Sequence, residues 1–169
     1  MSVRSFFDSN VLVYTDDESA PVKRMRALQL LKEHHETSSG VLSLQVLQEY
    51  FATVTRKLKV DVGLARQKVG IFSQLEVGIP SVSDLFGAID LHRLHGFSFW
   101  DALIIRMAQE TGCKVIYSED LQHAQHIGGI RIVNPFLETE HNLFAPNSGA
   151  IPSKLVLHGR RRRSTRKSI

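Results

Sequence analysis

The sequence has little of several features that mark particular classes of protein. It contains one cysteine, Cys113, so no internal disulfide framework can form, and a reducing cytoplasm is the expected location. No apolar run approaches the roughly 18 residues of a membrane-spanning helix. No secretory signal is expected, because Asp8 interrupts the apolar residues near the N-terminus. These absences predict a cytoplasmic protein without a membrane partner.

Two catalytic signatures are missing as well. No Gly-x-x-x-x-Gly-Lys-Ser/Thr loop occurs, which argues against an ATP-driven role. The sequence also gives no basis for a cysteine nucleophile or a Ser–His–Asp arrangement. What is present is an ordinary globular composition, 43% hydrophobic and 22% charged, in 169 residues. This length is enough for one domain with a sizeable core.

Positive charge is concentrated at the C-terminal end. Residues 160–169 hold six of the 21 basic residues and no acid, so residues 1–159 carry 15 basic and 17 acidic side chains, a net charge of −2. Such a basic segment can bind nucleic acid, an acidic partner or a membrane surface, or it can be solvated and without a role. Regular patterning ends near Phe136. We therefore predict a domain over residues 1–136 and an irregular, disordered and incidental tail over residues 137–169.

Short apolar segments alternate with amphipathic helical patterns along the predicted domain. Strands are expected near residues 5–7, 41–42, 77–81, 115–117 and 130–133, with helices between them. This alternation predicts an α/β fold with a mostly parallel, doubly wound central sheet of four or five short strands.

Four carboxylates stand at the ends or beginnings of these elements: Asp8, Glu49, Asp101 and Asp120. Asp8 and Asp120 each follow a strand directly, Glu49 lies in the second turn of a helix, and Asp101 opens another helix. In a parallel sheet, strand ends and the helix N-termini that follow them share one rim. We therefore expect the four side chains to converge there.

Each acid also has a purely structural interpretation. Asp8 and Asp120 can cap the segments that follow them. Ser98-x-x-Asp101 matches a capping box, and Glu49 can be a solvated residue on a helix face. Spacing alone leaves both interpretations open for all four.

Convergence of the four acids would have a chemical consequence. Two unit charges about 4 Å apart repel by about 4 kcal/mol at an effective dielectric constant near 20. Gathered carboxylates must therefore take up protons or hold a cation, and hard oxygen ligands favour Mg²⁺ or Mn²⁺ over zinc. Such an ion can activate water against a phosphodiester, which predicts a phosphodiesterase.

The ordered set of motifs resembles the PIN domain family. Phe-Phe-Asp8-Ser-Asn10 resembles its opening Asp-x-Asn motif, and Gln-Glu49-Tyr-Phe resembles its second acid. Phe-Trp-Asp101-Ala-Leu resembles its third motif, and Ser118-Glu-Asp120 its fourth. The likeness spans about residues 4–136 and is greatest to VapC-type toxins of bacterial toxin–antitoxin pairs.

This resemblance implies a three-layer α/β/α fold and Mg²⁺- or Mn²⁺-dependent endoribonuclease activity on RNA. It implies that Asp8, Glu49, Asp101 and Asp120 hold the metal, and that Asn10 and Ser118 orient them. Glu119 falls in a variable position of the motif. The resemblance also implies a cognate antitoxin protein and a homodimer. RNA phosphates would have to contact scattered basic residues: Arg56, Lys57, Lys59 and Arg106.

Two other functions remain open. A phosphatase or phosphotransferase with Asp8 as nucleophile is disfavoured by Asn10, because such enzymes, by resemblance, usually carry a second Asp there. A catalytically silent domain could instead bind RNA or protein through the same fold.

Overall fold

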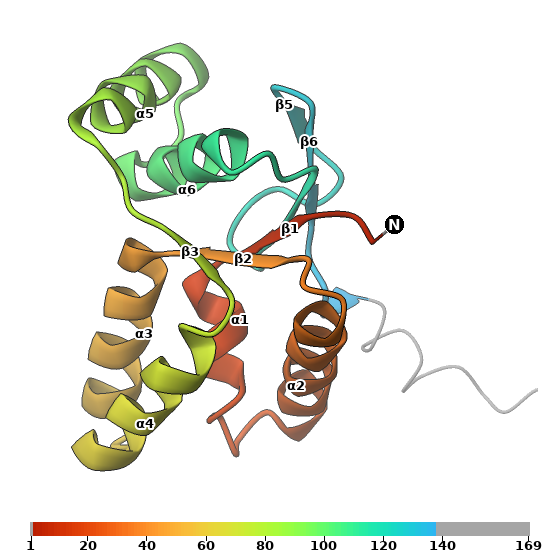
Figure 1. Cartoon of the computed structure of the whole chain (residues 1–169), viewed down its shortest axis with the longest axis vertical. Coiled ribbons are helices and arrows are strands. Elements are labelled where there is room, and N and C mark those ends of the chain that lie inside the picture. Colours follow the sequence, from red (N-terminus) through yellow and green to blue (C-terminus); the bar gives the residue numbers. More distant parts are fainter. Residues whose placement is uncertain (1, 138–169) are drawn as a thin grey trace, which may run out of the picture.

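The computed structural model describes residues 2–137, in which one twisted sheet lies between helices (Figure 1). Its strands are β1 (Ser5–Phe7), β2 (Gly40–Ser43), β3 (Glu76–Gly78), β4 (Val115–Tyr117), β5 (His126–Ile127) and β6 (Ile130–Val133). Its helices are α1 (Ser9–Tyr14), α2 (Pro21–Glu36), α3 (Leu44–Arg56), α4 (Val62–Phe72), α5 (Val82–His95) and α6 (Phe99–Glu110). The predicted α/β alternation is confirmed.

The strand order in the sheet is β3-β2-β1-β4-β6-β5. Every neighbouring pair is parallel except β5 and β6, so the mostly parallel sheet is confirmed. The expected number of strands was four or five, whereas the described residues form six. The additional strand is β5, which pairs with β6 across the turn at Gly128 and Gly129, both with positive φ (56° and 82°). A two-residue strand is too short to produce an alternating pattern in the sequence.

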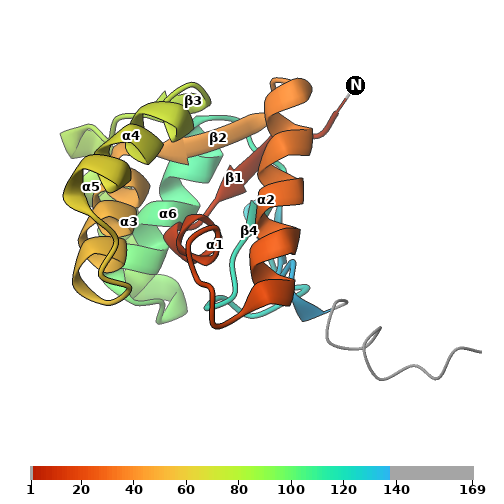
Figure 2. The same cartoon turned by 90° about the horizontal axis from the view of Figure 1, so that it is seen from below.

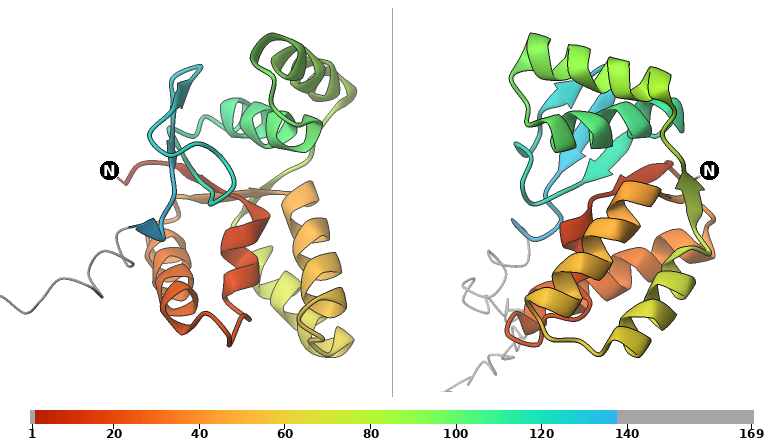
Figure 3. Two further views of the ribbon diagram at one scale, coloured as in Figure 1. Left: turned by 180° about the vertical axis from the view of Figure 1, so that it is seen from behind. Right: turned by 90° about the vertical axis from the view of Figure 1, so that its left-hand side faces the viewer.

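The sheet is covered on both faces, which confirms the three-layer arrangement. Helices α1, α2, α3 and α4 lie on one side, and α5 and α6 on the other (Figures 1 and 3). Seen from below, α1 lies between α2 and α3 (Figure 2), and it contacts both. The short helix α1 directly follows β1, so this layer brings the N-terminal segment beside α3.

The core is built on β1, which is buried along its whole length, as expected for a central parallel strand. Phe6 and Phe7 are fully buried, and Val46, Tyr50 and Val54 form the buried face of α3. Cys113 is a buried free thiol, as a core side chain should be. Burial of each large apolar side chain contributes about 1.5–3 kcal/mol to folding.

Serine side chains cap three of the described helices. Ser43 caps α3, and Ser98 caps α6. Helix α5 begins at Val82 with Ser81 as its cap, and Asp84 supplies the other half of a capping box. Among residues 2–137, every helix is too short or too polar to cross a bilayer. The predicted tail, apart from Leu137, lies outside the described residues.

Candidate active site

The first feature of the site is the adjacency of β1 and β4. These strands are parallel, with Phe7 paired with Tyr117, so the residues that follow them emerge side by side. The Asp8 backbone N–H donates to the Tyr117 carbonyl oxygen at 3.0 Å. The Ser118 hydroxyl then donates to Asp8 Oδ2 at 2.6 Å, a short, charge-assisted bond. Asp8 and Ser118, 110 residues apart in sequence, thus form one unit.

Asn10 joins this unit to Asp120. Its side-chain Nδ2 donates to Asp8 Oδ2 at 3.0 Å and to Asp120 Oδ2 at 3.1 Å. Its Oδ1 accepts from the Glu119 backbone N–H at 3.3 Å. The structure therefore brings four of the predicted site residues into one hydrogen-bonded group: Asp8, Asn10, Ser118 and Asp120.

Glu49 reaches the same group from α3 through Ser9. The Ser9 hydroxyl donates to Glu49 Oε2 at 2.8 Å, and the Ser9 backbone N–H donates to Asp8 Oδ1 at 2.6 Å. Gln45 Nε2 holds the other Glu49 oxygen at 2.7 Å, one helical turn earlier. The Gln45 Oε1 atom is buried without a hydrogen-bond partner among the described residues. The site thus contains a buried acceptor beside Glu49.

Asp101 lies apart from this group in its contacts. Its Oδ2 accepts from the Ser98 hydroxyl at 2.7 Å, and its backbone N–H donates to that hydroxyl at 3.2 Å. Within residues 2–137, no described hydrogen bond or ion pair joins Asp101 to Asp8, Glu49 or Asp120. Ser98 therefore caps α6 through the Asp101 backbone N–H, but the Asp101 carboxylate bonds to the Ser98 hydroxyl and not to the Ser98 backbone N–H that a full capping box requires. The convergence of Asp101 with the other acids stays a prediction.

Burial and charge act together on Asp8. Its side chain is 4% exposed, and this burial, the largest effect, raises its pKa to about 6 from the usual 3.8. The hydrogen bonds from Ser118 and Ser9 lower the pKa, while the charges of Glu49 and Asp120 raise it. The charges of two other acids therefore act on Asp8 at the carboxyl end of β1.

The donor set fits a hard divalent cation in its chemistry. All the acids supply carboxylate oxygens, and the charges of Glu49 and Asp120 disfavour the ionised form of Asp8, which a cation would reverse. In the part of the chain that the structure describes, however, no group of three or more Asp, Glu, His or Cys side chains is close enough together to hold a metal ion. The acids are gathered by hydrogen bonds through Ser9 and Asn10 rather than by direct convergence on a point.

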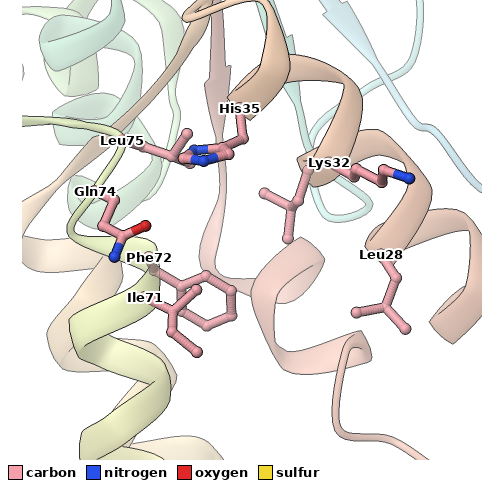
Figure 4. A pocket seen from close by; sticks show the side chains of 8 residues that line it. Leu28, Lys32, His35, Ile71, Phe72, Gln74 and Leu75 are labelled. Atoms are coloured by element: carbon pink, nitrogen blue, oxygen red, sulfur yellow. The ribbon is translucent and has the colours of Figure 1, made fainter.

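An apolar hollow lies elsewhere. It has a volume of about 280 Å³ and is formed by α2 and by the end of α4 with the residues that follow it (Figure 4). Leu28, Ile71, Phe72 and Leu75 give it an apolar lining, and Lys32, His35 and Gln74 are polar side chains beside them. None of the four acids lines this hollow.

Sequence reasoning missed several residues that support the acids. Gln45 carried a usable signal, because it lies four residues before Glu49 on the same helix. Ser9 lies between two motif residues and could have been named from the Asp-x-Asn spacing. Tyr14 and Lys23, which contact Glu119, carried none, because they lie 105 and 96 residues away from it in sequence.

Comparison with protein families accounts for this combination of fold and acids. The PIN domain model matches residues 5–128, so the chain belongs to the PIN domain family. No curated protein matches the sequence.

Two solved structures are similar in fold. One is VapC20 of Mycobacterium tuberculosis, described as a toxin that cleaves the sarcin–ricin loop, with 16% identity and a TM-score of 0.56. That match covers 69% of this chain and 89% of VapC20. The other is a toxin–antitoxin complex from Klebsiella pneumoniae, with 17% identity, a TM-score of 0.58, and coverage of 78% and 97% respectively.

Proposed function

We propose that this protein is a Mg²⁺- or Mn²⁺-dependent endoribonuclease and the toxin of a toxin–antitoxin pair. One observation carries the proposal. Asp8 is buried at the end of β1, and its pKa is raised to about 6 by burial and by the charges of Glu49 and Asp120. A buried acid surrounded by other acids is a group that binds a divalent cation rather than a substrate anion. PIN family membership supports the same reaction class.

In this proposal Asp8, Glu49, Asp101 and Asp120 hold the ion. When bound, the ion supplies Lewis-acid polarisation of a phosphodiester oxygen. Asn10 and Ser118 keep the Asp8 and Asp120 carboxylates oriented through the hydrogen bonds described above. Asp101 would contribute from the first turn of α6, where its carboxylate is half-exposed.

The expected RNA contacts fall into two groups. Arg56, Lys57 and Lys59 are exposed at and after the end of α3 and are available to phosphates. Arg106, by contrast, lies 3.2 Å from Asp84 and also pairs with Glu110. Since its charge is already compensated, Arg106 is the weakest of the predicted phosphate contacts.

An antitoxin partner is part of the proposal. The Klebsiella pneumoniae neighbour is a toxin–antitoxin complex, and the fold matches it over 97% of that chain. The apolar hollow beside α2 and α4 gives a protein segment a surface to cover, because apolar pockets of this kind favour buried anchors. An antitoxin segment bound in this hollow would not cover the four acids, so blocking them would require a second contact from the antitoxin.

A homodimer is proposed on the basis of α5. Val82, Leu85, Phe86 and Ile89 follow helical spacing and are all exposed, between 37% and 68%. An apolar stripe of this length is unusual on a free surface. We expect Phe86→Glu to convert a dimer to a monomer in light scattering; a wild-type monomer would contradict this part of the proposal.

The proposed reaction is tested by incubating the purified full chain with a mixed RNA pool. Cleavage is expected with Mn²⁺ or Mg²⁺ and not with EDTA. Asp90→Asn serves as the control variant, because Asp90 is an exposed helix acid outside the site. Equal cleavage with and without EDTA would refute metal dependence.

The toxin role is tested in cells. Expression of the wild-type chain without an antitoxin is expected to arrest bacterial growth, and substitution of the site acids is expected to relieve the arrest. Normal growth at a high level of folded wild-type protein would contradict the toxin role even if RNA is cleaved in vitro.

A catalytically silent PIN-like domain that binds RNA or protein is the second candidate. The observation that favours it is the hydrogen bond between Asp101 and Ser98. Among the described residues, Asp101 has no hydrogen bond to the other three acids. RNA binding without cleavage in any divalent metal would select this candidate.

A further inference from the structure

The Glu119 carboxylate makes its described contacts with Tyr14 and Lys23 and not with the site acids. Although Glu119 lies between Ser118 and Asp120, its side chain bonds to α1 and α2 instead. Tyr14 Oη donates to Glu119 Oε2 at 2.5 Å, and the Lys23 ammonium forms an ion pair with Glu119 Oε1. Lys23 Nζ also donates to Tyr14 Oη at 3.2 Å. The three side chains thus contact one another pairwise, and we call them the Glu119 triad.

The backbone of Glu119 is held at the same time from the other side. Its N–H donates to Asn10 Oδ1, and Asn10 in turn contacts Asp8 and Asp120. The middle residue of the turn that carries Ser118 and Asp120 is therefore anchored twice, once through its peptide and once through its side chain. Movement of Glu119 would displace both Asp120 and the amide of Asn10.

Charge gives the triad a second effect. Glu119 is one more carboxylate beside Asp120 in the turn that follows β4, and its backbone N–H is bonded to the same Asn10 that contacts Asp8 and Asp120. Lys23 compensates that extra charge. Its Nζ atom also lies 4.9 Å from the centroid of the Tyr14 ring and 5.7 Å from that of the Phe136 ring. With Lys23 paired to it, Glu119 neither competes for a cation nor adds repulsion to the site.

We propose that Lys23, Tyr14 and Glu119 are positioning residues of the nuclease site, which fix the turn carrying Ser118 and Asp120 in its cation-binding arrangement. Glu119 is then not a metal ligand. This inference rests on the proposed function, because it concerns how that site is held.

The molecule contains a matched control for this triad. Lys68 forms an ion pair with Asp16, and Tyr50 Oη donates to Asp16 Oδ2 at 2.8 Å, which reproduces the Lys–carboxylate–Tyr chemistry. The two lysine side chains are equally buried, 23% exposed for Lys23 and 25% for Lys68. In the described contacts the control triad joins α3 and α4 to the end of α1 and does not touch Asn10, Ser118 or Asp120.

The experiment compares Lys23→Met, Tyr14→Phe and Lys23→Arg with Lys68→Met in the full chain. Mn²⁺ affinity is measured by calorimetry, and RNA cleavage is resolved into kcat and KM. Lys23→Met is expected to weaken Mn²⁺ binding and kcat about tenfold each, with KM for RNA changed less than about twofold. Tyr14→Phe, which removes one hydroxyl, is expected to lower Mn²⁺ affinity and kcat about threefold each. Lys23→Arg is expected to lower them by no more than that.

A double variant separates the two effects of the triad. If uncompensated charge is part of the damage, Lys23→Met with Glu119→Gln should bind Mn²⁺ about threefold tighter than Lys23→Met alone. Lys68→Met is expected to lower thermal stability but to leave Mn²⁺ affinity and kcat unchanged. Circular dichroism verifies folding, and Tyr14→Phe keeps the test valid if Lys23→Met does not fold.

Three results would overturn the inference, and they are distinguishable. Wild-type Mn²⁺ affinity and kcat in both Lys23→Met and Tyr14→Phe would show that the triad does not position the site. Equal losses in Lys68→Met would show a general effect of stability. A wild-type protein that neither binds Mn²⁺ nor cleaves RNA would refute the proposed function and this inference with it.

Discussion

Asp8 and Asp101 stand in similar local settings with different structural origins. Each lies at the beginning of a helix, and each accepts a serine hydroxyl at nearly the same distance, 2.6 Å from Ser118 and 2.7 Å from Ser98. The serine of Asp8 is 110 residues away in sequence, whereas the serine of Asp101 is three residues away. Asp8 is therefore held by the tertiary fold, and Asp101 by its own helix.

The difference shows that a motif acid can be held by residues distant in sequence or only by residues of its own helix. Asp8 is buried, and its carboxylate accepts from Ser9, Asn10 and Ser118. Asp101 is half-exposed and bonds within the first turn of α6. We infer that Asp8 carries a cost in folding stability that Asp101 does not, while the proposed reaction requires both.

The largest expected effect is on cleavage. Asp8→Asn and Asp101→Asn are each expected to reduce metal-dependent RNA cleavage by on the order of 10³-fold, because each removes a charged ligand from the proposed metal site. Cleavage is measured with the same RNA pool and the Asp90→Asn control. Retained activity in both variants would refute the proposed four-acid site. Retained activity in Asp101→Asn alone would limit the site to Asp8 and the two acids that hydrogen bonds link to it.

The next effect separates the two acids by stability in metal-free buffer. The folded pKa of Asp8, about 6, lies above the usual 3.8, so folded protein binds more protons than unfolded protein between these values. The free energy of unfolding therefore falls as pH rises from about 4 to about 6, because Asp8 loses its proton. Above that range, the ionised Asp8 lowers the free energy of unfolding by about 3 kcal/mol.

Asp8→Asn removes this cost, but its amide NH₂ group faces one of the hydrogen-bond donors that the Asp8 carboxylate accepts from. We expect it to be more stable than wild type by about 1–3 kcal/mol near pH 8, and the gain to shrink as pH falls toward about 4. Asp101 is half-exposed, so Asp101→Asn should not be stabilised in this way. Denaturant titrations at both pH values measure this, and a pH-independent difference for Asp8→Asn would contradict the raised pKa.

The two serines provide a smaller comparison. Ser118→Ala removes the bond to Asp8 and also an acceptor for the Asp120 and Leu121 backbone N–H groups, so we expect a loss of about 1–3 kcal/mol. Ser98→Ala removes a helix cap and should cost about 1 kcal/mol. Thermal unfolding measures both, and a larger loss for Ser98→Ala would reverse the ranking.

The smallest effect is expected from removal of residues 138–169. Asp8, Asp101 and their serine partners all lie within residues 2–137. Cleavage per molecule should stay within about twofold of the full chain, with the loss limited to electrostatic attraction of RNA, which high salt would screen. A loss of activity at every salt concentration would assign the C-terminal segment a direct role.

The sequence was most informative where local patterns coincide with strand ends. Asp8 and Asp120 follow recognisable strands, and parallel pairing of those strands predicts their proximity. Strand β5 could not be anticipated, because its two residues are defined only by pairing with β6. The Glu119 triad could not be predicted from the sequence either. Its other members lie on α1 and α2, and the packing of these helices against the turn that follows β4 depends on the whole fold.

The pairing of β1 with β4 also has a consequence for biosynthesis. Until the ribosome has released the segment around Val115–Ser118, the growing polypeptide has an Asp8 but no Ser118, Asp120 or completed rim. The proposed toxic activity is therefore absent from nascent chains and from truncated chains that end before Asp120. A cell translating this protein is exposed to the activity only after nearly the whole domain has been made.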